Sequence, residues 1–227
     1  MPEPLAFYPL NARYKAAEKE NRQPKGILRN VGITDGPYNE PGGAYMFYGT
    51  ANSYIEFPNN GGLDTRFLIT LMCWVQPGGQ DGPLFSYGDV TFSIEIKLGK
   101  LLFVQKSPGF YYGTNTGTTE LLPAGKWVHV AASYDQNSGN HSLYINGHLT
   151  AFRKSRRGYW TATASRRVLM GVYDDELNGY FKGKIAEMKV YDVALNEAQI
   201  QTSIRQGSFT FSRNLSLITL SKDSFNQ

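Results

Sequence analysis

The sequence has only one cysteine, Cys73, in 227 residues, so no disulfide can form within the chain. Cys73 lies in the apolar run 67–75, which predicts a buried and unreactive thiol. No stretch approaches the roughly 20 apolar residues of a membrane span, and residues 1–4 lack the basic and apolar parts of a signal peptide. We therefore expect no direct insertion into a membrane, and a domain that belongs to a larger protein.

Acidic residues are missing from a long central part of the chain. No Asp or Glu occurs between Gln136 and Tyr173, although the net charge of the whole chain is only +4. Guanidinium groups bind sulfate and carboxylate through paired hydrogen bonds, so the cations of this stretch predict a polyanion site. The alternative is a solvated basic loop that only aids solubility. The candidate ligand-binding residues are Arg153, Lys154, Arg156, Arg157, Tyr159, Trp160, Arg166 and Arg167.

A second candidate surface is the Gly-rich segment 107–117, which we interpret as a loop. Tyr111 and Tyr112 follow Phe110 directly in this segment. Aromatic rings in such a place can stack on sugars or anchor a protein partner, and they can equally fold back onto the domain.

Hydrophobic patterning predicts an all-β domain. The apolar run 67–75 is typical of a central strand that is covered on both faces. Asn146-Gly147 separates two alternating segments and predicts a type I′ hairpin turn. Ten or more short strands without intervening helices favour a two-sheet antiparallel β-sandwich.

One short helix is expected near the end of the chain. Leu195, Ile200 and Ile204 have the spacing of one helical face, with Asn196 as a cap at the start and Gly207 at the end. We expect one domain over residues 1–207, and residues 208–227 to form a C-terminal tail or an added edge strand.

Several segments, in this order and spacing, resemble laminin G-like, concanavalin A-like jelly rolls, the group that includes the pentraxins. The most specific are Gly125-Lys-Trp-Val-His-Val-Ala-Ala-Ser-Tyr-Asp135 and Leu143-Tyr-Ile-Asn-Gly147, followed by Phe181-Lys-Gly-Lys-Ile-Ala-Glu-Met-Lys-Val-Tyr-Asp192. The resemblance extends over residues 5–205. It implies a jelly roll that serves as an extracellular binding module and commonly binds glycosaminoglycans.

The chain departs from this group where many relatives hold a structural calcium ion. Their acidic loop after the first strand is replaced by residues 14–19, and Ala186 stands where they have an Asp. Calcium needs several oxygen ligands, so we predict that this site is empty. The other candidate calcium ligands are Asp174 and Asp175, with Asp89, but they offer fewer oxygens than the pentraxin pattern. No cofactor is therefore predicted.

Catalytic residues are also missing from the pattern. Glu56 and Glu95 stand alone among apolar neighbours, and there is no nucleophile elbow, zinc ligand set or phosphate loop. We predict a non-catalytic extracellular recognition or adhesion module that binds glycans, with acidic or sulfated sugars favoured. The alternative function is a protein–protein adhesion module, and a more remote alternative is a glycoside hydrolase. Nucleic acid is not an expected partner.

Overall fold

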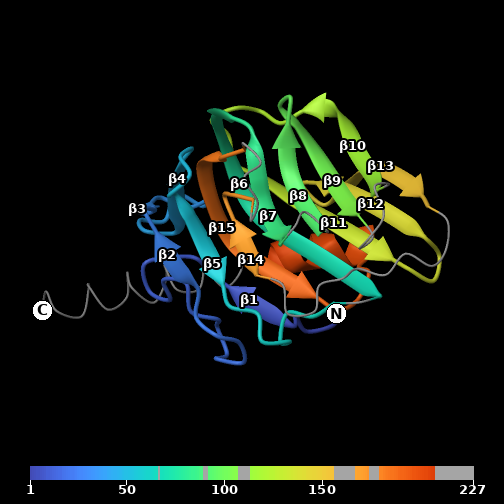
Figure 1. Ribbon diagram of the computed structural model, residues 1–227, viewed down its shortest axis with the longest axis horizontal. Coiled ribbons are helices and arrows are strands. Elements are labelled where there is room, and N and C mark those ends of the chain that lie inside the picture. Colours follow the sequence, from blue (N-terminus) through green and yellow to red (C-terminus); the bar gives the residue numbers. More distant parts are fainter. Residues whose placement is uncertain (66, 89–91, 107–112, 156–166, 174–178, 208–227) are drawn as a thin grey trace, which may run out of the picture.

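The computed structural model describes residues 1–65, 67–88, 92–106, 113–155, 167–173 and 179–207. They form two antiparallel β-sheets stacked face to face (Figure 1). The strands of the eight-stranded sheet are β1 (Ala6–Tyr8), β3 (Gly32–Thr34), β4 (Ala44–Tyr48), β6 (Leu68–Gln80), β11 (Val128–Asp135), β12 (Asn140–Ile145), β13 (His148–Lys154) and β15 (Lys182–Tyr191). Their order is β13–β12–β11–β6–β15–β4–β3, and β1 pairs with β15.

The second sheet has seven strands. They are β2 (Ile27–Arg29), β5 (Tyr54–Phe57), β7 (Gly82–Tyr87), β8 (Phe92–Lys97), β9 (Lys100–Lys106), β10 (Gly113–Leu121) and β14 (Val168–Met170). Their order is β10–β9–β8–β7–β14–β5–β2. The predicted fold class, an antiparallel β-sandwich with a short C-terminal helix, is confirmed.

The core between the sheets follows from the alternation of side chains along each strand. In β6, Leu71 and Cys73 point inward into the main core, whereas Met72 points outward. All three are buried, so β6 is covered on both faces, as the sequence predicted. Burial raises the pKa of the Cys73 thiol to about 12, which keeps it protonated and inert.

A helix over residues 197–207 covers part of the outer face of the eight-stranded sheet. Ile200, on this helix, and Leu195, just before it, are buried with Met72 and Tyr144 of the sheet. Asn196 Oδ1 accepts a hydrogen bond from Gln199 N at 3.0 Å, which confirms Asn196 as the helix cap. No helix of the described chain is long and apolar enough to cross a membrane.

The predicted hairpin is confirmed, because Asn146 and Gly147 join β12 to β13 with φ values of 50° and 82°. The loop predicted over 107–117 is wrong in part, since residues 113–117 belong to β10. Thr114 and Thr116 of β10 pair with β9, and this cross-strand pairing outweighs the turn preference of the glycines.

Candidate functional site

Three of the predicted ligand-binding cations lie at one end of the sandwich. Arg153 and Lys154 end β13, and Arg167 directly precedes β14. All three side chains are exposed. We call Phe152, Arg153, Lys154 and Arg167 the basic end.

The strand register decides where these side chains point. Phe152 lies opposite Ser142, and Lys154 lies opposite Asn140. Because alternate residues share a face, Phe152 and Lys154 point together to the outer side of the eight-stranded sheet, whereas Arg153 points toward the other sheet. Phe152 has 55% of its surface exposed, which makes it an aromatic neighbour for any ligand of Lys154.

Arg153 joins the edges of the two sheets. Its Nη1 donates a hydrogen bond of 2.9 Å to the backbone oxygen of Asn115 in β10. The segments 107–112 and 156–166, which contain most of the predicted ligand residues, therefore border strand ends that lie side by side. Tyr111, Tyr112, Arg156, Arg157, Tyr159, Trp160 and Arg166 themselves lie outside the described residues.

The charges of Arg153 and Lys154 are not neutralised by a carboxylate in the described part of the chain. His141, opposite Arg153, is buried, and burial together with the Arg153 charge lowers its pKa to about 4. This imidazole is therefore neutral near pH 7, and the exposed guanidinium and ammonium groups carry the positive charge.

Arg167 is separated from the other two cations across the end of the domain. Four strand spacings separate β14 from β10, which is roughly 19 Å at about 4.8 Å per strand. This exceeds the roughly 8 Å over which physiological salt screens charge. A ligand that contacts both places must therefore be extended.

Phe152 is the one residue of the basic end that the sequence prediction missed. The sequence feature that could have identified it is its position two residues before Lys154, which places both side chains on one face of a strand.

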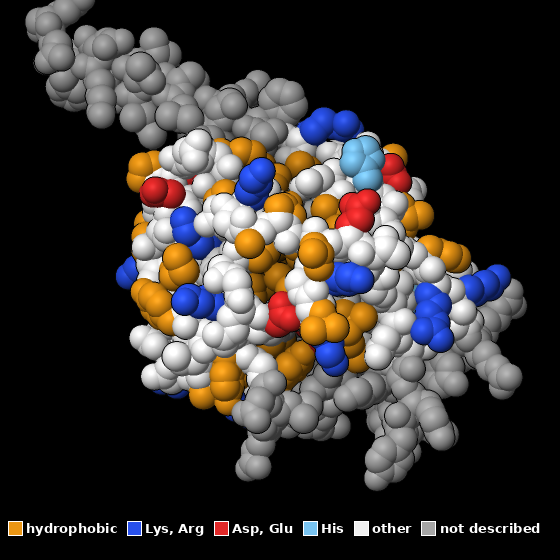
Figure 2. Space-filling view, turned by 90° about the horizontal axis from the view of Figure 1, so that it is seen from above, with side chains coloured by type: hydrophobic (Ala, Val, Ile, Leu, Met, Phe, Trp, Pro, Cys, Tyr) orange, Lys and Arg blue, Asp and Glu red, His pale blue; other side chains and the backbone are white. Residues whose placement is uncertain are grey.

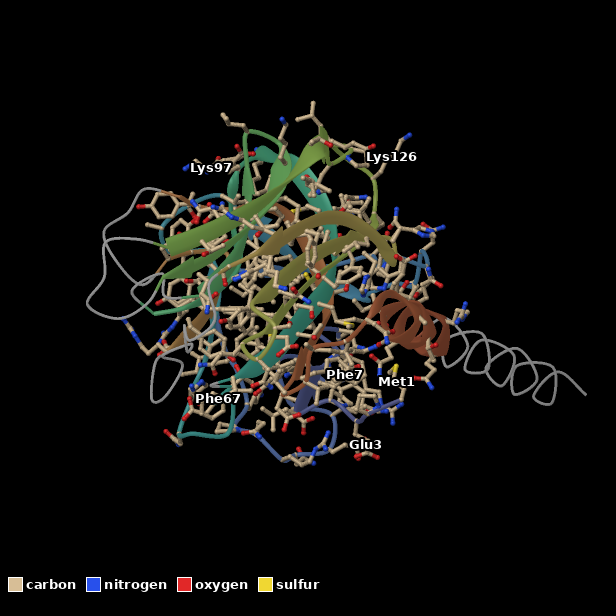
Figure 3. All side chains as sticks on the ribbon, turned by 90° about the vertical axis from the view of Figure 1, so that its right-hand side faces the viewer. Met1, Glu3, Phe7, Phe67, Lys97 and Lys126 are labelled. Carbon is tan, nitrogen blue, oxygen red and sulfur yellow. The ribbon has the colours of Figure 1, made fainter. Side chains whose placement is uncertain are left out.

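The opposite end of the sandwich carries Lys97 and Lys126, far from Phe67 (Figure 3). Viewed from that side, Lys and Arg side chains are interspersed with Asp and Glu (Figure 2).

A hollow of about 1240 Å³ lies on the outer face of the eight-stranded sheet, away from the basic end. We call it the β1–β15 groove. Phe7 of β1 and Glu187 and Lys189 of β15 form its floor, Tyr38 and Glu40 come from the loop before β4, and the helix adds Ser203. Figure 3 shows Met1, Glu3 and Phe7 together near the helix.

Glu187 and Lys189 are placed by a β-bulge, where the register of β15 against β6 shifts between Ala186 and Lys189. Lys189 Nζ donates a hydrogen bond of 3.1 Å to Ser203 Oγ and lies 3.9 Å from Glu187 Oε2. Burial raises the pKa of Glu187, although Lys189 and Lys19 oppose the change. Burial also lowers the pKa of Lys189.

Comparison with known proteins assigns the family. Residues 49–201, more than half of the chain, match the family described as the concanavalin A-like lectin/glucanases superfamily. The chain belongs to this superfamily.

Individual proteins that resemble this chain have sequence identities of 12–25%. C-reactive protein of Sus scrofa is 25% identical over 156 residues, which cover 64% of this chain and 67% of that protein. Domain 4 of AbnA, an extracellular GH43 arabinanase from Geobacillus stearothermophilus solved in complex with arabinotriose, superposes with a TM-score of 0.71. It is 21% identical and covers 88% of this chain and 97% of its own.

The binding domain of botulinum neurotoxin serotype G has the same TM-score, 0.71, at 12% identity. The match covers 91% of this chain, but only 51% of the toxin domain. At these identities the two solved structures show a shared fold.

The superfamily includes glucanases, and a glycosidase site would require a pair of carboxylates in this chain. Glu56 and Glu95 both lie on the outer face of the seven-stranded sheet, since Ile55 and Ile94 beside them point into the core. Three strand spacings separate β5 from β8, which is about 14 Å. Glycosidase pairs are about 5–5.5 Å or 6.5–9.5 Å apart, so these two do not form one. Glu95 instead accepts a hydrogen bond from the Tyr173 hydroxyl.

The structural calcium site of superfamily relatives does not fit the residues of this chain. The side chain of Glu18 is fully buried, and its carboxylate accepts hydrogen bonds from the backbone N–H groups of Phe7, Glu20 and Arg22 at 2.8–3.1 Å. A carboxylate engaged in this way is not available as a metal ligand, and Ala186 offers no side-chain oxygen. Among the described residues, no group of three or more His, Cys, Asp or Glu side chains could hold a metal ion. The candidate ligands Asp89, Asp174 and Asp175 lie outside the described residues.

Proposed function

We propose that this domain is a non-catalytic, extracellular recognition module that binds acidic glycans, above all sulfated ones, through the basic end. The observation that carries the proposal is the exposure of Arg153 and Lys154 beside Phe152, without a carboxylate partner in the described chain. Cations of this kind bind sulfate and carboxylate groups, and an exposed aromatic ring can stack on the sugar that bears them.

The relatives support carbohydrate as the ligand class. The arabinanase domain of the same fold was solved with a trisaccharide bound. The predicted cations and aromatic residues of segments 107–112 and 156–166 would extend the surface, because described residues that flank both segments form the Arg153–Asn115 hydrogen bond. The distance to Arg167 favours a polymer over a single sugar.

Retention on immobilised heparin in a salt gradient tests the proposal. Lys154→Glu should elute at clearly lower salt than the native chain, with an affinity roughly two- to fivefold lower, as expected for one exposed ionic contact. Replacing Arg156 and Arg157 by Ala should lower the elution salt further. Lys126→Glu makes the same charge change at the opposite end and should elute with the native chain. If Lys154→Glu and Lys126→Glu shift elution equally, the basic end is not the site.

A protein partner is the second candidate. Leu149 and Phe152 are exposed on the edge strand β13 and offer apolar contacts that salt does not screen. Binding that survives high salt and is lost in Phe152→Ser would favour this alternative.

A further inference from the structure

We propose that the β1–β15 groove is a second ligand site, which binds a neutral saccharide chain, with Glu187 and Lys189 holding its hydroxyl groups. This inference does not depend on the basic end, because the two surfaces share no residue. It rests on the charge balance, the polar geometry and the size of the groove.

The groove has no excess of either charge. Among its described lining residues, four carboxylates face four Lys and Arg side chains. Three pairs lie within ion-pair distance, at 3.7–3.9 Å: Lys19 with Glu20, Arg22 with Glu3, and Lys189 with Glu187. A polyanion or a simple cation would gain little electrostatic binding energy from such a surface. A neutral polar ligand could form hydrogen bonds with both donors and acceptors.

Glu187 presents an acceptor that the rest of the described chain does not use. Its carboxylate forms no hydrogen bond there, and its one ion pair within 4 Å among the described residues is with Lys189 at 3.9 Å. Its φ of 51° lies in the left-handed region, which residues other than Gly rarely adopt. Such strain is characteristic of functional sites.

The spacing of Glu187 and Lys189 suits a hydroxyl group. At 3.9 Å the two charged atoms are too far apart for a direct hydrogen bond. One hydroxyl oxygen about 2.8 Å from both atoms would meet them at an angle of about 90°. It would donate to the carboxylate and accept from the ammonium group, as only a group with both capacities can. Sugars carry several such hydroxyls in a row.

The walls suit the apolar faces of sugar rings. Tyr14 and Tyr38 line the walls beside Phe7 in the floor, and all three are partly exposed. The volume of about 1240 Å³ exceeds the roughly 300–1000 Å³ of a pocket for one small molecule, so the groove has room for several sugar rings.

Titration calorimetry with four neutral trisaccharides tests the inference: arabinotriose, xylotriose, cellotriose and maltotriose. At least one should bind the native chain, and Glu187→Gln should weaken it at least tenfold, while its binding should not change with salt. Glu120→Gln, an exposed carboxylate on β10 far from the groove, is the matched control and should bind as the native chain does.

Glu187→Gly keeps the test valid if Glu187→Gln folds poorly. Glycine adopts a φ of 51° without strain, so this variant should be at least as stable as the native chain and yet lose trisaccharide binding. Lys154→Glu should leave trisaccharide binding unchanged, and Glu187→Gln should leave heparin retention unchanged, so the two sites succeed or fail separately. The inference is overturned if no trisaccharide binds the native chain, or if Glu187→Gly binds as tightly as the native chain.

Discussion

At the scale of single residues, Glu18 organises the first loop of the domain. Its buried carboxylate satisfies three backbone N–H groups and lies 3.7 Å from the Arg22 guanidinium. In this chain a buried carboxylate binds the backbone of the loop directly.

We expect Glu18→Ala to lower the free energy of unfolding by about 3 kcal/mol, because it removes three backbone hydrogen bonds to a charged acceptor. Urea denaturation measures this loss. Glu20→Gln, two residues away on an exposed side chain, should change stability by no more than about 0.5 kcal/mol. Equal effects of the two substitutions would show that the Glu18 hydrogen bonds do not hold the loop.

Two buried histidines should make the domain sensitive to acid. Burial and the Lys189 charge lower the pKa of His129 to about 3, and burial and Arg153 lower that of His141 to about 4. An unfolded histidine has a pKa of about 6.5, so between these values the unfolded chain binds protons that the folded chain does not. The stability from both groups is complete above pH 6.5 and falls as the pH falls, by up to about 1.4 kcal/mol per pH unit for each histidine.

Urea denaturation between pH 6.5 and 4.5 checks this dependence. His129→Phe keeps a ring beside Trp74 but cannot be protonated, so its stability should fall less steeply than that of the native chain. The difference should reach roughly 2 kcal/mol at pH 4.5. Parallel curves for the two proteins would contradict the assigned role of His129.

At the scale of elements, the helix over residues 197–207 depends on its cap. Asn196 and Gln199 exchange reciprocal hydrogen bonds between side chain and backbone at 2.9 and 3.0 Å. Asn196→Ala should lower stability by about 1 kcal/mol in thermal or urea unfolding. Asn137→Ala, at an exposed turn, is the matched control and should have little effect. Similar losses in both would mean that the cap contributes nothing.

Elements with strong local signals could be predicted from the sequence. The apolar run that became β6, the Asn146-Gly147 turn and the helix cap each depend on residues close together in the chain. β2, β3 and part of β10 escaped prediction for the opposite reason. β2 and β3 have three residues each, and β10 is rich in Thr and Gly. Their strand conformation comes from pairing with β5, β4 and β9.

At the scale of the whole molecule, the two candidate sites differ in how far they could be predicted. Arg153 and Lys154 are neighbours in the sequence, so composition alone drew attention to them. The groove joins Phe7, Tyr38, Glu187 and Ser203, which only the folded chain brings together. The bulge that places Glu187 has no signature in the sequence, because Glu is not a residue that predicts a positive φ.

The pairing of β1 with β15 also determines how the domain would respond to force. Ala6 lies opposite Val190 and Tyr8 opposite Met188, so the chain enters and leaves this pair at the same end. Once the helix is pulled away, tension on both ends of the chain would break the ladder one hydrogen bond after another, like a zipper. Phe7 and Lys189 are paired in this ladder, so the floor of the groove would open first. A saccharide bound across it would act as a clasp, and ligand binding would then be coupled to mechanical load.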